Sequence, residues 1–125
     1  MTTNPQGHPL LEGIRILDLA DEKASFCSKV LADLGADIIK VERPGGDPSR
    51  NRGPFLGNAA SPDKSLFFSY QNTNKRSITL NLETKEGRDI FRRLLERYEI
   101  VVETFPPGYM EELGLGYALL SASHP

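Results

Sequence analysis

The chain has 125 residues, of which 38% are hydrophobic and 26% charged, so it can bury a core and form one globular domain. Its formal net charge of −2 excludes a strongly basic surface, and neither nucleic acid nor a membrane is expected as a partner. The single cysteine, Cys27, excludes an internal disulfide.

Residues 1–12 are polar and contain two prolines, which predicts a flexible N-terminal tail. The start of the chain lacks the basic and apolar regions of a signal peptide. No apolar run approaches the roughly 20 residues of a membrane span. We therefore expect a cytoplasmic protein whose residues 13–125 form one domain.

A strand–helix–strand unit is predicted next. Residues 14–19 and 37–42 have the apolar character of short strands. Between them, the apolar residues of segment 24–34 recur at the spacing of one helix face. Gly35 stands where a helix C-cap is expected. The short connections favour parallel pairing of the two strands with a right-handed crossover.

Residues 43–64 contain four glycines and four prolines, which predicts a long loop without extended regular structure. Gly45 and Gly46 follow a strand, but no helix opens after them, so a turn is the better interpretation than a phosphate loop. Segment 65–70 is apolar and aromatic, and its pattern fits either a strand or a short helix.

The second half repeats the alternation of strands and helices. Residues 77–82 alternate as a half-buried strand does, Thr84 is a candidate N-cap for a helix over 85–98, and 100–104 is a further strand. Two short helical segments are expected near 109–113 and 117–122. This order predicts an α/β fold with an open Rossmann-like, mostly parallel sheet flanked by helices.

The usual catalytic and nucleotide-binding motifs are absent: the sequence has no GxGxxG, GxxxxGK[ST] or GxSxG. His8, Cys27 and His124 lack the spacing of metal ligands, so no metal site is predicted. Asp18 lies inside a predicted strand and is the acid with the strongest expectation of burial.

Candidate ligand-binding side chains cluster around the ends of the predicted strands. Arg43 follows the second strand, Asn74-Lys75-Arg76 precedes the third, and Thr104-Phe105 ends the fourth. Guanidinium and ammonium groups suit phosphates, and an aromatic ring suits a purine or an acyl chain. Taken singly, each is better explained as a solvated loop charge or, for Phe105, as a core aromatic. If they form one site, Arg43 and the 74–76 corner should lie side by side at the C-terminal edge of the sheet.

Six motifs in order carry a family resemblance: GIRILDL at 13–19, LADLGADIIKVE at 31–42, GGDPSR at 45–50, NTNKRS at 72–77, VETFPPG at 102–108 and LGLGY at 113–117. They resemble the N-terminal part of class III CoA-transferases, a family that includes carnitine CoA-transferase, formyl-CoA:oxalate CoA-transferase and α-methylacyl-CoA racemase.

The resemblance implies coenzyme A as a substrate, with an acyl-CoA and a carboxylic acid as partners and an interlocked homodimer as the assembly. It also implies an aspartate nucleophile that lies beyond residue 125, so the 125-residue chain alone is expected to be inactive. The CoA contacts carried over from the family fall on Lys23, Ala24, Arg43, Asn74, Lys75, Arg76, Thr104 and Phe105.

The chain departs from the family pattern around the first loop. Asp21-Glu22-Lys23 replaces a segment that ends in Ala-Gly-Pro, and Thr104 replaces an asparagine. Two carboxylates there oppose a polyanionic ligand, and Lys23 offsets part of that charge. Two alternatives stay open at the level of sequence: a fragment of an α-methylacyl-CoA racemase, or a truncated CoA-binding remnant without catalytic function.

Overall fold

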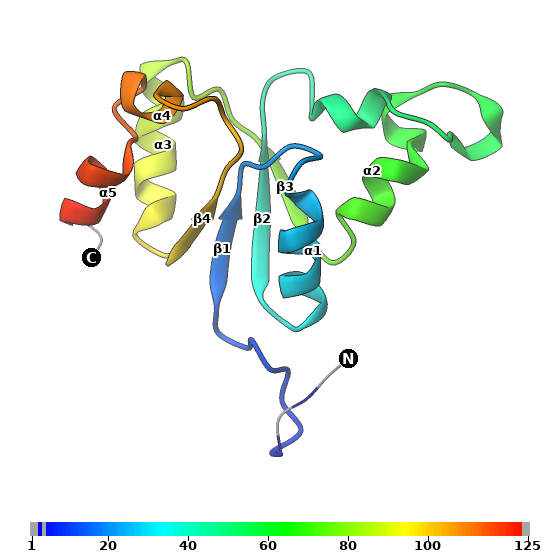
Figure 1. Ribbon diagram of the computed structural model, residues 1–125, viewed down its shortest axis with the longest axis horizontal. Helices are drawn as coiled ribbons and strands as arrows, with labels where there is room; N and C mark the ends of the chain where they lie inside the picture. The colour runs from blue at the N-terminus through cyan, green and yellow to red at the C-terminus, as the bar shows by residue number, and fades with distance from the viewer. Residues whose placement is uncertain (1–2, 4, 124–125) are drawn as a thin grey trace.

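The computed structural model of the chain describes residues 3 and 5–123. Its centre is a sheet of four parallel strands in the order β3-β2-β1-β4 (Figure 1). The strands are β1 (Arg15–Asp18), β2 (Asp37–Glu42), β3 (Arg76–Thr79) and β4 (Ile100–Val102). The predicted open, parallel α/β sheet is therefore confirmed.

Helices cover both faces of this sheet (Figure 1). On one face lie α1 (Ser25–Asp33) and α2 (Leu66–Gln71); on the other lie α3 (Lys85–Leu95), α4 (Tyr109–Glu112) and α5 (Tyr117–Ser123). The segment at 65–70, which fitted either a strand or a helix, forms α2, because the Ser65 hydroxyl accepts a hydrogen bond from the Phe68 N–H at 3.0 Å.

The alternation of side chains along the strands explains the two layers. Leu17 of β1 and Ile39 of β2 point toward α3 and pack around Phe91, which is fully buried. Their neighbours Ile16 and Ile38 point the other way, toward α1. Successive residues of a strand face opposite sides, so two apolar residues in a row supply one side chain to each layer.

The predicted boundaries shift by a few residues at three elements. The strand expected at 77–82 is observed at Arg76–Thr79, the strand at 100–104 ends at Val102, and the helix at 85–98 ends at Leu95. Leu80 and Leu82 are still buried as the alternation predicted, and the Leu80 N–H bonds the Glu42 carbonyl at 2.8 Å. The chain therefore stays extended a little beyond the regular ladder.

The start of α3 is fixed by two neighbouring residues. The Thr84 hydroxyl accepts a hydrogen bond from the Gly87 N–H at 3.1 Å, which confirms Thr84 as the N-cap. Gly87 lies so close to the preceding turn that a Cβ atom there would stand 1.7 Å from the Asn81 carbonyl oxygen. Only glycine fits this position.

The loop at 43–64 contains only short 3₁₀ turns, at Pro48–Asn51, Leu56–Asn58 and Pro62–Lys64, as its composition predicted. Gly45 and Gly46 form a turn with φ of 89° and 87°, in which the Gly46 N–H bonds the Arg43 carbonyl.

Near the start of the chain, Leu11, at the end of the predicted tail, packs against the apolar cluster under α1. In the described part of the chain, no helix has the length and apolar character needed to cross a membrane.

Candidate functional site

The order of the strands creates a crevice at their C-terminal ends. From β1 the chain runs outward to β2 and β3, and it then returns to the opposite side of β1 as β4. The chain continues from β1 to α1 on one face of the sheet and from β4 to α4 on the other, and such a switch point is where open α/β sheets bind ligands. A cavity of about 180 Å³ lies there, lined by residues from segments 19–23, 41–48 and 104–106.

Four of the eight predicted CoA contacts line this cavity: Lys23, Arg43, Thr104 and Phe105. The Arg43 side chain is exposed and forms no hydrogen bond or ion pair with any described residue. The Phe105 ring lies 4.8 Å from the Tyr109 ring, centre to centre, at a tilt of 40°. The cavity thus combines a free guanidinium with an aromatic wall.

Lys23 is engaged with the loop to which it belongs. Its Nζ lies 2.6 Å from Asp21 Oδ2. The Thr104 hydroxyl accepts from the Asp21 N–H at 2.9 Å and donates to Asp21 Oδ1 at 2.9 Å, which joins the loops after β1 and β4. Burial opposes ionisation of Asp21, but hydrogen bonds from Lys23 and Thr104 outweigh it and keep the pKa of Asp21 below 3.8. Ala24, the next predicted contact, is the N-cap residue of α1 and does not line the cavity.

The prediction that the 74–76 corner lies beside Arg43 is wrong. Asn74 donates to Asp33 at the end of α1, and Arg76 pairs with Asp37 at the first residue of β2, with Nη2 to Oδ1 at 2.6 Å. All strands run parallel, so a segment that precedes β3 enters the sheet at the edge opposite to Arg43, which follows β2. A residue before a strand and a residue after one belong to different edges.

Lys75 reaches back toward the C-terminal edge, but its ammonium group is buried and fully occupied. Its Nζ donates to Asp18 Oδ2 at 2.8 Å, to the Ser25 carbonyl at 2.8 Å and to the Asn72 side-chain oxygen at 2.9 Å. An ammonium group has three donors, so none is left for a phosphate. Burial lowers the pKa of Lys75, although the Asp18 carboxylate acts in the opposite direction.

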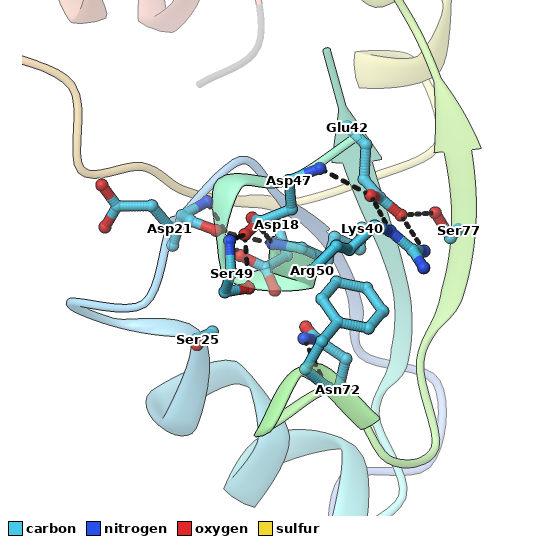
Figure 2. A network of polar contacts seen from close by, with 12 residues as sticks. Asp18, Asp21, Ser25, Lys40, Glu42, Asp47, Ser49, Arg50, Asn72 and Ser77 are labelled. Atoms are coloured by element: carbon cyan, nitrogen blue, oxygen red, sulfur yellow. Dashed lines mark hydrogen bonds and ion pairs between the residues drawn. The ribbon is translucent and has the colours of Figure 1, made fainter. Parts of the chain in front are cut away.

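Lys75 belongs to a buried ionic layer on the α1 side of the sheet. Figure 2 shows Asp18, Lys40, Glu42, Asp47 and Arg50 of this layer. Three carboxylates face three cations there: Asp18, Glu42 and Asp47 against Lys40, Arg50 and Lys75. Asp18 is fully buried, as its place in a strand predicted, and also accepts from the Ser28 hydroxyl at 2.6 Å and the Ala20 N–H at 3.0 Å. The layer is electrically balanced within itself.

Glu42 has the best-defined environment in the ionic layer. The Arg50 guanidinium donates two hydrogen bonds to the Glu42 carboxylate, of 2.6 and 2.7 Å. The same guanidinium lies 3.7 Å from the centre of the Phe68 ring. Burial opposes ionisation of Glu42, but donors from Arg50, Ser77 and the Asp47 backbone lower its pKa from 4.5 to about 2. Sequence reasoning missed this layer, although Lys40 and Glu42 stand two apart in an apolar strand and therefore share one face.

A larger cavity of about 600 Å³ lies on the outer side of β4, between α3 and α5. Its polar lining includes Glu99, Glu103 and Glu111 but neither lysine nor arginine. Size alone would favour it as a binding site, but its acidic rim opposes a polyanionic ligand. The smaller cavity at the switch point is also lined by acids, Asp21, Glu42 and Asp47, but each of them is paired with a cation. It differs from the larger cavity in holding a cation that is unpaired among the described residues, Arg43.

No group of three His, Cys, Asp or Glu side chains that could hold a metal ion is found among residues 3 and 5–123. His8 and Cys27 belong to this part of the chain, whereas His124 lies outside the described residues.

A family model described as CoA-transferase family III matches residues 11–125. The chain belongs to CoA-transferase family III. The sequence resemblance is thereby confirmed.

Curated members of CoA-transferase family III are similar along nearly the whole chain. A succinyl-CoA:mesaconate CoA-transferase of Haloarcula marismortui is 43% identical over 92% of this chain and 29% of its own length. A succinyl-CoA:(R)-benzylsuccinate CoA-transferase subunit of Thauera aromatica is 41% identical over 86% of this chain and 26% of its own length. The chain therefore spans less than a third of the relatives it matches.

Solved structures of similar proteins share the fold. A CAIB/BAIF family protein from Brucella suis has a TM-score of 0.82 and 37% identity, over 93% of this chain and 31% of its own. A hypothetical protein from Mycobacterium tuberculosis has a TM-score of 0.80 and 36% identity, over 92% of this chain and 31% of its own. The Rossmann-like domain of this family III chain thus corresponds to about a third of each of these proteins.

Proposed function

We propose that the chain is the CoA-binding portion of an enzyme that moves CoA between an acyl-CoA and a carboxylic acid. The proposal combines the family membership with the cavity at the switch point. CoA is polyanionic at its nucleotide end and carries a purine, and the cavity offers a guanidinium and an aromatic ring for these groups.

The observation that carries the proposal is the unpaired Arg43 side chain. In the ionic layer, Lys40, Arg50 and Lys75 are all paired with carboxylates, and Lys23 at the cavity is paired with Asp21. Arg43 is the cation of the cavity that keeps its donors for a ligand. A guanidinium can bind one phosphate through two parallel hydrogen bonds.

The acids beside the cavity favour one placement of the phosphates. Asp21 lies on the α1 side of the cavity and keeps its charge, whereas Arg43 lies on the β2 side. Like charges repel, so the phosphates of CoA should bind toward Arg43 and away from the first turn of α1. In this placement Phe105 is the ring available to the purine.

For the transfer step, we expect the route that the resemblance implies. A carboxylate of the enzyme attacks the thioester carbonyl, the C–S bond breaks, and the CoA thiolate leaves behind a mixed anhydride. The thiolate then attacks the enzyme's own acyl carbon, releases the donor acid and forms an aspartyl thioester, and an acceptor carboxylate repeats the two steps in reverse. The nucleophile belongs to sequence beyond residue 125, and Asp18 is unsuited to the role because three donors already hold its buried carboxylate.

The assembly is also a proposal. Large apolar side chains are exposed at several places, among them Tyr117 with 83% and Leu56 with 62% of their surface accessible. In a protein more than three times this length, later segments or a partner subunit can cover them. We expect the 125-residue chain to associate in light scattering, and a monodisperse monomer would count against a covered surface.

The test of CoA binding is calorimetric titration of the chain with CoA. Arg43→Ala should weaken binding by about 1.5–3 kcal/mol, the usual size of a charge-assisted hydrogen bond. Arg93→Ala is the matched control, because Arg93 is also an exposed arginine but lies on α3, outside the lining of the cavity. Equal affinity in the two variants would show that Arg43 is an ordinary loop charge.

The test of inactivity uses the same preparation with succinyl-CoA and several carboxylic acids. We expect no exchanged CoA and no covalent adduct by mass spectrometry. An adduct on any acid of the 125-residue chain would place the nucleophile inside it.

A further inference from the structure

We propose that Lys40 is a positioning residue that fixes the two walls of the switch-point cavity relative to each other; the inference rests on the proposed function of that cavity as the CoA site. Lys40 lies in the middle of β2, and its side chain is 1% exposed. It cannot touch a ligand in the cavity from there. Its effect has to pass through the groups that it holds.

The Lys40 ammonium bonds one group from each wall. Its Nζ donates to the Ala20 carbonyl at 2.6 Å and lies 2.9 Å from Asp47 Oδ2. Ala20 directly precedes Asp21, which lines the cavity on the α1 side, and Asp47 lines it on the opposite side. The buried Lys40 ammonium thus joins the loop after β1 to the loop after β2.

Each of these two groups is itself the start of a local network. The Ala20 N–H donates to Asp18 Oδ1 at 3.0 Å, so the peptide units on both sides of Ala20 are held. Asp47 accepts from the Ser49 N–H at 2.8 Å and donates its own N–H to Glu42 Oε2 at 2.9 Å, which orders the turn next to Arg43 (Figure 2). Lys40 therefore connects the network around Ala20 with the network around Asp47.

The surface connection between these loops is an ion pair of Glu22 with Arg52, whose side chains are 46% and 55% exposed. Exposed pairs of this kind contribute little, because water and salt screen them and two long side chains must be ordered. Lys40 and Asp47, at 1% and 7% exposure, are not screened in this way. The buried link is the one able to hold the walls.

Stability alone gives little reason for a lysine at this place. A buried ion pair often contributes no more to stability than an apolar pair of similar volume. An apolar side chain at position 40 would fill the space but could not direct the Ala20 carbonyl or the Asp47 carboxylate. The structure thus assigns Lys40 to the geometry of the cavity.

The experiment compares the wild-type chain with Lys40→Met, which keeps the length of the side chain and removes its charge. In the chain without ligand, we expect faster amide hydrogen exchange in segments 19–24 and 43–49 together. We also expect CoA affinity in calorimetry to fall by about tenfold or more, since disordered walls must be ordered on binding. Phe91→Leu, in the core on the other face, is the control for a general loss of stability: it should lower the melting temperature without altering either readout.

The outcomes separate the two proposals. If exchange in either segment is unchanged in Lys40→Met, or if both segments loosen and CoA binds as before, Lys40 does not position the cavity. A fall in affinity that disappears at high salt with unchanged exchange reports charge alone and also overturns the proposal. If the wild-type chain does not bind CoA at all, the proposed function fails, and hydrogen exchange alone then decides whether Lys40 holds the two loops.

Discussion

The two faces of this sheet are built on different principles. Under α3, the strands present Leu17, Ile39 and Leu80 to the buried Phe91, and the contact is apolar throughout. Under α1 and the loop at 43–64, the same strands change from apolar to ionic as they approach the C-terminal edge, with Asp18, Lys40 and Glu42 in place of aliphatic residues.

This difference separates stability from positioning. Apolar contacts are not directional, and their contribution depends on area and packing. Ion pairs and hydrogen bonds are directional, and burying them costs desolvation that their pairing only offsets. The ionic face is also the one that carries the loop next to Arg43. We infer that the α3 face supplies most of the folding free energy, and that the ionic face sets the shape of the cavity.

The largest test of this contrast removes one partner of a buried pair. Asp18→Asn leaves the Lys75 ammonium buried without its carboxylate, and Lys75→Met leaves the Asp18 carboxylate buried without its cation. Each should cost about 3–5 kcal/mol in urea unfolding, whereas the double variant should cost less than either single one because no buried charge is then unpaired.

The control for that cycle pairs residues from different faces. Phe91→Leu and Asp18→Asn share no partner, so their costs should add to within about 0.5 kcal/mol. If Asp18→Asn and Lys75→Met also add, the ionic pair is not coupled and the contrast between the faces fails.

The next test measures how the stability of the chain depends on pH through the Glu42 carboxylate. The pKa of Glu42 is about 2 in the folded chain, below its ordinary value of 4.5, so the folded state favours the ionised form. The stabilisation is complete above pH 4.5 and is lost as the pH falls toward 2, with at most about 3 kcal/mol involved. Urea unfolding at pH 6 and pH 3 should show a larger loss for the wild type than for Glu42→Gln, which has no carboxylate to protonate. Parallel losses in both proteins would refute the assignment.

A smaller effect is expected on the α3 side. Thr84→Ala removes the hydroxyl that caps the Gly87 N–H and should cost about 1 kcal/mol. Thr84→Ser keeps the hydroxyl and should retain most of the stability. CoA affinity should be the same in both, because this helix end is remote from the cavity. A change in affinity would show that the two faces are not independent.

The smallest effect concerns the edge of the ionic face. Asp21→Asn keeps an oxygen for the Thr104 hydroxyl and removes a charge beside the proposed phosphate site. CoA should bind up to about 1 kcal/mol more tightly at low ionic strength, and the gain should shrink as salt is added. Glu22→Gln, which lies in the same loop but outside the cavity lining, should have a smaller effect. Weaker binding of Asp21→Asn would place the phosphates elsewhere.

Much of the fold could be predicted from the sequence because its signals are local. Alternating apolar residues mark β3 and the extended residues after it, down to Leu82, and the spacing of buried residues marks α1 and α3. The ends of the elements were less accurate, since the chain stays extended or helical for a few residues without completing the ladder. That Arg43 and Phe105 lie at one cavity could be predicted because Arg43 directly follows β2 and Phe105 comes three residues after β4.

The errors concern contacts between distant segments. Lys75 pairs with Asp18, which lies 57 residues earlier in the sequence, and no local sequence pattern predicts such a pair. The 74–76 corner lies at the edge opposite to Arg43 because it precedes β3, and proximity to a strand does not reveal the edge unless the direction of the strand is also known. A charged residue in an apolar strand, as at Lys40, was the available sign of a buried partner, and the partner itself came only from the three-dimensional arrangement.

The late arrival of β4 in the chain has a consequence for the order of events during synthesis. The strand pairs with β1, and Thr104 closes onto Asp21 across 83 residues of sequence, after β2 and β3 have already been made. Contacts between such distant residues form late, because the intervening chain must first be ordered. A nascent chain that has left the ribosome only as far as β3 would contain Arg43 and the ionic layer but not the part of the cavity lining at Thr104 and Phe105. If the cavity binds CoA as we propose, binding should therefore appear abruptly, once the residues around Phe105 have emerged, and not grow in proportion to the length of chain.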